Sequence, residues 1–197
     1  FELPEMRLPS VKASFSEVEA ATASFGHGLS VSLLHMAAAY SAIANGGNYV
    51  APTLYKREMA EAEGIYQRVL APETSANMRY LLRLNAVEGS GTQMNRETLG
   101  YRTGGKTGTA EKVVDGAYSS SKVTNFFASV FPMDAPRYAM VIMVDEPRAE
   151  NPQSGTTAGW NAGAVSGRII QRVAPMLGVA PDFSETLDRE LLPQAMR

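Results

Sequence analysis

The segment of residues 101–145 constrains the fold more than any other part of the chain. It contains three runs rich in Thr, Val, Phe, Tyr and Ile, at residues 101–114, 123–131 and 137–145, and such residues favour strands. Asp115-Gly116 and Asp134-Ala135-Pro136 separate the runs, and both are typical of turns. Because strands joined by short turns pair antiparallel, the sequence predicts a three-stranded antiparallel meander.

Helical patterns flank this meander. Apolar residues at helical spacing run from Leu33 to Ala44, after the possible N-caps Ser30 and Ser32 and before a stop signal at Asn45-Gly46-Gly47. Further helices are predicted at residues 72–87 and at about 160–177. Loops are predicted at Phe25-Gly26-His27-Gly28 and at residues 146–157. Helices before and after a β-meander indicate an α+β fold.

The composition narrows the classes of function. With 197 residues, 45% of them hydrophobic, the chain has the size of one globular domain. Its formal net charge of -2 provides no basic field, so nucleic acid is not an expected partner. It has no cysteine and only two histidines, His27 and His35, so thiolate chemistry and a metal site are not expected, and no cofactor is predicted.

The start of the chain suggests that an upstream part of the protein has been removed. The chain opens at Phe1 without a methionine, and its first residues lack the pattern of a signal peptide. It also has no run of about 18 apolar residues that would predict a membrane-spanning helix. We therefore expect that any membrane anchor lies outside this sequence.

The run Lys106-Thr107-Gly108-Thr109 lies inside the first β-type segment, directly after Gly104-Gly105. Two blocks precede it: S-F-G-H-G-L-S-V-S at residues 24–32 and A-Y-S-A-I-A-N-G-G at residues 39–47. In this order the three blocks resemble class B penicillin-binding proteins over about residues 1–177, and they look closest to the septal (cell-division) peptidoglycan D,D-transpeptidase. K-T-G is one of the motifs of serine β-lactamases and penicillin-binding proteins.

The resemblance implies a fold and a division of the chain. The fold is the C-terminal part of a penicillin-binding protein/serine β-lactamase-like fold, an antiparallel β-meander packed with helices. Residues 1–180 would form the C-terminal portion of the transpeptidase domain, and residues 181–197 would be a C-terminal tail.

The resemblance also implies roles for the K-T-G strand. Acyl transfer from a D-Ala-D-Ala stem peptide through an acyl-serine must hold a carboxylate, stabilise an oxyanion and activate a hydroxyl. Lys106 and Thr109 would be catalytic: Lys106 would place positive charge beside the nucleophile, and the Thr109 N–H would be one oxyanion-hole donor. The Thr107 and Thr109 hydroxyls would bind the terminal carboxylate. Gly108 would leave room for the peptide to pair with an edge strand.

The serine nucleophile is not expected in this chain. Ser119-Ser120-Ser121-Lys122 matches S-x-x-K, but it follows the K-T-G and is predicted to lie in a turn, whereas the mechanism needs the serine at the start of a buried helix. Ser75-Ala76-Asn77 matches S-x-N, but it lies in the first turns of a predicted helix, where a capping role is expected. In the family order, both true motifs would precede Phe1.

The functional prediction is a transpeptidase that cross-links septal peptidoglycan in the periplasm, is anchored to the inner membrane upstream, and is inactive as this piece alone. Its expected partners are the stem peptide, division-complex membrane proteins, and β-lactams as covalent inhibitors. Two alternatives stay open: a non-catalytic penicillin- or peptide-recognising sensor or scaffold module, and a piece of a serine β-lactamase-like hydrolase. A lone three-stranded meander would expose an edge and an apolar face, so marginal stability or self-association is also expected.

Overall fold

A computed structural model describes residues 2, 7–149 and 151–184 of the chain. Its centre is an antiparallel sheet in the order β3-β4-β5, which confirms the predicted meander. The strands are β3 (Gly104–Val114), β4 (Ala117–Phe131) and β5 (Tyr138–Asp145). Asp115 and Gly116 form the first turn with φ angles of 52° and 82°, left-handed values that suit a two-residue hairpin.

The start of β4 is the strand boundary that differs most from the prediction, whereas β3 starts three residues later than predicted and β5 one residue later. β4 begins at Ala117 and not near residue 123, so the segment from Ser119 to Lys122 lies in a strand and its predicted turn conformation is wrong. The reason is the tight turn, after which pairing resumes at once with Val114 opposite Ala117. A β-bulge between Glu111 and Lys112 then absorbs the extra residues of β4.

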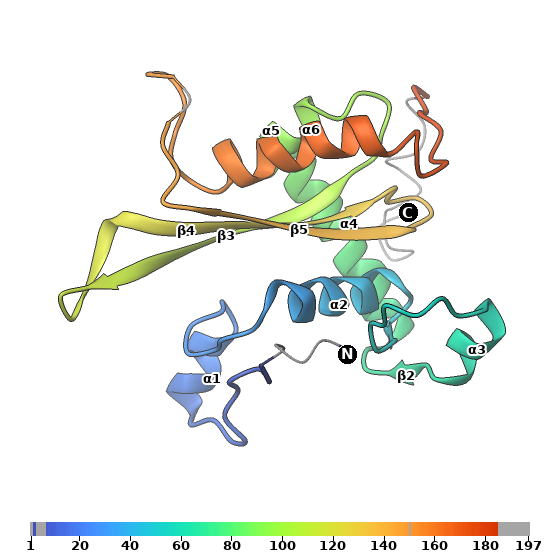
Figure 1. Ribbon diagram of the computed structural model, residues 1–197, viewed down its shortest axis with the longest axis horizontal. Coiled ribbons are helices and arrows are strands. Elements are labelled where there is room, and N and C mark those ends of the chain that lie inside the picture. The colour runs from blue at the N-terminus through green and yellow to red at the C-terminus, as the bar shows by residue number, and fades with distance from the viewer. Residues whose placement is uncertain (1, 3–6, 150, 185–197) are drawn as a thin grey trace.

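Helices lie on both faces of the sheet, as an α+β fold requires (Figure 1). On one face lie α5 (Thr92–Arg96), the π-helical turn η1 (Gly159–Gly163) and α6 (Ala164–Val173), and on the other lies α2 (Leu33–Ala44). α4 (Pro72–Glu88) contacts α2, β3 and α5, so it joins the two faces. On the side of α2 lie α1 (Glu17–Ala23), α3 (Met59–Gly64) and the short pair β1 (Asn48–Tyr49) and β2 (Gln67–Arg68).

Alternation along β4 divides the core into two layers. Phe127 and Phe131 are fully or almost fully buried in one cluster, which also contains Met94 of α5 and Ile170 of α6. Val130 belongs to a second cluster, with Leu82 and Met133 and with Tyr40 and Ile43 of α2 packed against it. Successive strand residues point to opposite faces, so this central strand contributes to both layers and holds β3 in place beside it.

The long helices match the sequence predictions. α2 starts after Ser32, whose Oγ accepts from the backbone N–H of His35 at 3.3 Å. α4 starts with Pro72 at its first position and runs one residue past the predicted end. The last helix begins as η1 and its α-helical part ends at Val173, before the predicted residue 177.

The sequence did not predict the short helices, and the structure contradicts the role predicted for one motif. α1 was not predicted; Ser16 and Glu19 start it with a capping box, and it ends before the predicted loop at residues 25–28. α3 and α5 were not predicted either. The capping role of Ser75 is wrong, because Pro72 takes the first helical position and leaves Ala71 as the N-cap. Ser75 is buried, and its hydroxyl donates to the backbone oxygen of Ile43 at the end of α2.

The first residues of the predicted tail lie against the domain. The Asp182 N–H donates to the Gly100 oxygen at 2.7 Å, and the Arg102 guanidinium lies 3.2 Å from the Asp182 carboxylate. Residues 185–197 of the tail lie outside the described part of the chain. Within the described residues, no helix is both long enough and apolar enough to cross a membrane.

Candidate functional site

β3 is an edge strand, and its odd-numbered residues turn their backbone groups toward the open side. The Gly105 carbonyl accepts from Asn85 Nδ2 at 2.7 Å, and the Thr107 carbonyl accepts from Lys106 Nζ at 3.0 Å, so both carbonyls face side chains and not β4. The N–H and C=O of a strand residue point to the same side, and that side alternates along the strand. The backbone N–H of Thr109 therefore also faces the open edge.

The predicted site residues Lys106, Thr107 and Thr109 lie together along this edge. Lys106 Nζ is 3.2 Å from Thr107 Oγ1, so its ammonium reaches both the hydroxyl and the carbonyl of its neighbour. Lys106 and Thr109 are exposed and Thr107 is half-buried. Two donor hydroxyls, an ammonium and an outward backbone N–H thus line one strand, and this set can bind a carboxylate and stabilise an oxyanion.

The glycines of the strand have two different environments. A Cβ on Gly105 would lie 2.4 Å from Phe127 Cε1 and 2.5 Å from the Ala128 oxygen, so this glycine permits packing inside the sheet. A Cβ on Gly108 would meet nothing closer than Phe126 Cβ at 3.6 Å, an ordinary contact. Packing inside the structure therefore does not require a glycine at position 108, and the expectation that Gly108 leaves room for a ligand stays a prediction.

The turn after α4 lies directly against the K-T-G strand. Ser90 Oγ is 2.8 Å from Thr107 Oγ1, and the N–H of Ser90 donates to Asn85 Oδ1 at 3.1 Å. Neither Asn85 nor Ser90 was predicted to be a site residue. No local signal could have selected them, because they lie 20 and 17 residues from their partners Gly105 and Thr107 and meet them only through the packing of α4 on β3.

The start of η1 lies against the contact between Ser90 and Thr107. A Cβ on Gly159 would lie 2.4 Å from the Ser90 oxygen and 3.8 Å from Thr107 Cγ2, so η1, the turn after α4 and β3 meet here. Asn125 on β4 is fully buried opposite Thr109, and its Nδ2 donates to the Thr156 oxygen at 2.7 Å and to Asn161 Oδ1 at 3.0 Å. The residues that lead into η1 are thus fastened to the sheet at the level of the K-T-G run.

The S-x-x-K match lies away from this arrangement. Ser119 and Lys122 both lie in β4. Ser119 pairs with Lys112 beyond the bulge, and the Lys122 N–H donates to Ser119 Oγ at 3.3 Å. Neither residue is at the start of a helix. Among the described residues, no group of three or more His, Cys, Asp or Glu side chains could hold a metal ion.

Comparison with known proteins decides the family. The family model of the penicillin binding protein transpeptidase domain matches residues 4–170. The chain belongs to this family. The resemblance expected from the three sequence blocks is therefore confirmed, and so is the predicted α+β fold with its antiparallel meander, which matches solved transpeptidase-domain structures.

Relatives of this transpeptidase-family chain extend beyond it. It is 37% identical over 187 residues to the probable peptidoglycan D,D-transpeptidase FtsI of Caulobacter vibrioides. This alignment covers 90% of the present chain and 31% of the Caulobacter protein. It also resembles the solved transpeptidase domain of Burkholderia pseudomallei penicillin-binding protein 3, with a TM-score of 0.74 and 33% identity over 86% of this chain and 50% of that one. Penicillin-binding protein 3 of Mycobacterium tuberculosis, solved with ampicillin, matches with a TM-score of 0.64 and 28% identity over 82% of this chain and 38% of that one.

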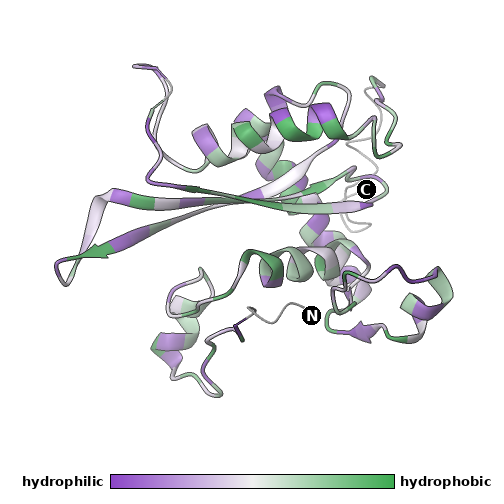
Figure 2. Cartoon of the chain, viewed as in Figure 1, coloured by the Kyte–Doolittle hydropathy of each residue, from purple (hydrophilic) through white to green (hydrophobic). Residues whose placement is uncertain are grey.

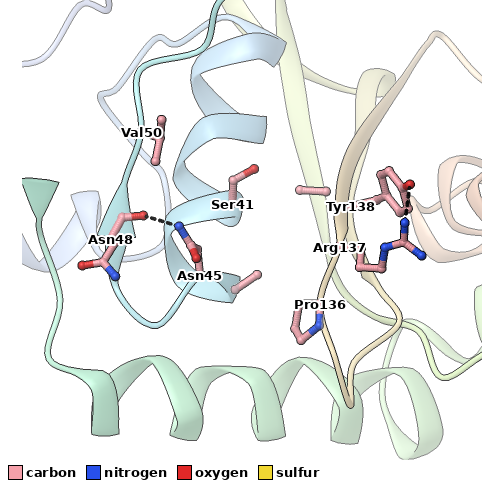
Figure 3. Close-up of a pocket in the computed structure, with 9 residues that line it drawn as sticks. Ser41, Asn45, Asn48, Val50, Pro136, Arg137 and Tyr138 are labelled. Atoms are coloured by element: carbon pink, nitrogen blue, oxygen red, sulfur yellow. Dashed lines mark hydrogen bonds between the residues drawn. The ribbon is translucent and has the colours of Figure 1, made fainter. Parts of the chain in front are cut away.

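A separate pocket of about 260 Å³ lies away from the K-T-G strand of this transpeptidase-family chain (Figure 3). Its walls are the end of α2, the segment through β1, and the start of β5. In the sheet, β4 lies between β5 and the K-T-G strand β3. Asn45 Nδ2 donates to the Asn48 oxygen at 3.4 Å on one wall, and Arg137 lies beside Tyr138 on the other. None of the predicted site residues lines this pocket.

Proposed function

We propose that residues 1–180 are the C-terminal portion of the transpeptidase domain of a peptidoglycan D,D-transpeptidase, and that β3 is its substrate-binding edge. The observation that carries the proposal is the open edge of β3, where Lys106, Thr107 and Thr109 present an ammonium, two hydroxyls and an outward N–H. Family membership and the name of the Caulobacter relative support the same activity.

In this proposal the chain binds the D-Ala-D-Ala end of a stem peptide. The peptide lies beside residues 101–110 and pairs with the outward backbone groups of β3, as an added strand does. Its terminal carboxylate accepts hydrogen bonds from the hydroxyls of Thr107 and Thr109. Gly108, between them, leaves the space that a side chain would take from the peptide.

The acyl transfer itself uses a serine in residues that precede Phe1. That serine attacks the carbonyl carbon of the penultimate D-Ala, and the Thr109 N–H supplies one donor to the oxyanion that forms. Lys106 stabilises the deprotonated nucleophile and takes part in the relay that protonates the departing D-Ala. An amine of a second stem peptide then attacks the acyl-serine ester and completes the cross-link.

The setting of the reaction follows from the same proposal. A stem peptide is a periplasmic substrate, so the domain lies in the periplasm and an upstream helix anchors it to the inner membrane. Its similarity to a relative named FtsI favours a role in septal cross-linking with division-complex membrane proteins. A β-lactam carboxylate would occupy the place of the peptide carboxylate, and a similar structure contains ampicillin.

A fluorescent penicillin tests the proposal. We expect covalent labelling of the full-length protein that contains this chain, no labelling of the 197-residue chain alone, and unchanged labelling of full-length Ser119→Ala. Labelling of the isolated chain at a serine would show that it has its own nucleophile. A full-length protein that does not label would disprove the assignment as a penicillin-binding transpeptidase, and rapid hydrolysis of the acyl-enzyme would favour a β-lactamase-like hydrolase.

A further inference from the structure

A chain of hydrogen bonds starts and ends on β3 and passes through the turn after α4. Lys106 Nζ lies 3.2 Å from Thr107 Oγ1, which lies 2.8 Å from Ser90 Oγ. Ser90 Oγ lies 3.2 Å from Asn85 Oδ1, and Asn85 Nδ2 donates to the Gly105 carbonyl at 2.7 Å. Two side chains outside the K-T-G motif are therefore connected to Thr107.

The direction of each hydrogen bond follows from the donors that are available. Backbone groups fix the Asn85 amide, since Nδ2 faces the Gly105 carbonyl and Oδ1 faces the Ser90 N–H at 3.1 Å. Oδ1 can only accept, so the Ser90 hydroxyl donates to it and offers a lone pair to Thr107. An ammonium can only donate. Thr107 Oγ1 therefore accepts from Lys106 and points its own hydrogen at Ser90.

A carboxylate that binds at Thr107 needs this same hydrogen. When Thr107 donates this hydrogen to the carboxylate, it no longer donates to Ser90. The Ser90 hydroxyl can then turn from Asn85 and donate to Thr107 over the same 2.8 Å contact. Asn85 Oδ1 keeps the backbone N–H of Ser90, so no acceptor loses its last donor. Only a side chain that can both accept and donate supports Thr107 in the two states, and a hydroxyl does this.

We propose that Ser90, held by Asn85, is a positioning residue that supports the Thr107 hydroxyl before and after a carboxylate binds. The inference rests on the proposed function, in which Thr107 contacts the substrate carboxylate. In the bound state Thr107 donates to the carboxylate while it accepts from Ser90 and Lys106, and hydrogen bonds linked in this way strengthen one another. Ser90 itself acts only through Thr107.

The test measures the second-order acylation rate of the full-length protein with a penicillin and with its methyl ester, which lacks the free carboxylate. We expect Ser90→Ala to slow the free acid by about fivefold, the effect of one hydrogen bond of about 1 kcal/mol. With the methyl ester, the rate of Ser90→Ala should stay within about twofold of the wild-type rate. The ester has no free carboxylate for Thr107 to bind, so the loss of the hydrogen bond from Ser90 should have little effect. Ser90→Thr should keep the free-acid rate, and Ser120→Ala is the control for an exposed serine elsewhere on the domain.

A double mutant separates positioning from general damage. If Ser90 acts through Thr107, the pair Ser90→Ala with Thr107→Val should react with the free acid no more slowly than Thr107→Val alone. Equal slowing of acid and ester, additive losses in the double mutant, or a wild-type free-acid rate for Ser90→Ala would each overturn the inference. A wild-type protein that no penicillin acylates would instead overturn the proposed function, and the inference with it.

Discussion

At the scale of single residues, the K-T-G strand depends on glycines that serve different purposes. Gly105 is buried against Phe127 and the backbone of Ala128, so any side chain there collides with the centre of the sheet. Gly108 has room for a methyl group and is needed bare only if a ligand lies beside the strand. The two positions thus separate the stability of the strand from its proposed use.

In the full-length protein, we predict that alanine at position 105 lowers stability, whereas alanine at position 108 slows acylation. Gly105→Ala should lower the free energy of unfolding by about 1–3 kcal/mol, because a buried backbone oxygen cannot move away. Gly108→Ala should leave the urea midpoint nearly unchanged and should slow penicillin acylation about tenfold, which equals about 1.4 kcal/mol. Urea unfolding and fluorescent labelling measure the two effects. Normal acylation of Gly108→Ala would show that no ligand lies against this residue.

At the scale of elements, the β3-β4 hairpin extends beyond the end of β5 and is fastened at its base (Figure 1). Lys112 of β3 contacts the carboxylates of Asp145 at 2.7 Å and Glu146 at 3.0 Å, and Thr124 of β4 donates to Asp145 at 2.7 Å. These contacts join all three strands directly beyond the K-T-G run. They should limit the motion of the hairpin relative to the K-T-G run of β3.

The charges at the hairpin base predict its pH dependence. The hydrogen bonds from Lys112 and Thr124 lower the pKa of Asp145 below its ordinary 3.8. The carboxylates of Asp145 and Glu146 raise the pKa of Lys112 above its ordinary 10.5. Asp145 therefore contributes stability above about pH 3.8 that is lost as the pH falls through its depressed pKa, and Lys112 contributes stability that is lost as the pH rises through its elevated pKa.

Replacement of Lys112 should bring the pKa of the Asp145 carboxyl closer to its ordinary value. In Lys112→Ala we expect the pKa of Asp145 to rise, but not fully to 3.8, because Thr124 still donates to the carboxylate. Lys122→Ala, a nearby exposed lysine, is the matched control and should leave this pKa unchanged. NMR titration of the carboxyl carbon measures both. An unchanged pKa in Lys112→Ala would mean that the contact does not persist in solution.

At the scale of the whole molecule, the described part of the chain leaves many large apolar side chains exposed. α2 is predominantly hydrophobic along its length (Figure 2), yet only Ala38 and Ala42 of its residues are buried. Large apolar side chains before it are exposed, among them Leu8, Val18 and Phe25 at 74% or more. A helix that is apolar on all sides normally has neighbours on all sides. Among the described residues, α2 is only partly covered on the face away from the sheet.

This surface predicts how the chain behaves by itself. We expect the 197-residue chain to self-associate at micromolar concentration and to unfold without a sharp transition, since apolar surface and sheet edges promote association. Co-expression with the upstream part of the protein should yield a monodisperse complex. Sedimentation velocity at several concentrations, together with a urea melt, tests the expectation. A monomer of constant sedimentation coefficient with a cooperative melt would contradict it.

Local patterns in the sequence determined much of this molecule. Strand-forming runs separated by Asp-Gly and Asp-Ala-Pro predicted the meander, helical spacing predicted α2 and α4, and the position of Lys106-Thr107-Gly108 in the first run placed the motif on a strand. These features depend on residues close together in the chain, where hydrophobic period and turn chemistry act directly. Short helices such as α1 and α5 lacked enough repeats to show a period, so they were not predicted.

Only the tertiary structure decided what surrounds the motif. That Thr107 contacts Ser90, that Asn85 reaches the Gly105 carbonyl, and that Ser75 is buried instead of capping α4 all depend on how α4 packs between α2 and β3. Contacts between residues far apart in sequence are set by the packing of whole elements, and neither spacing nor composition specifies them. The K-T-G run could therefore be recognised from sequence, whereas the hydrogen bonds that hold its threonine could not.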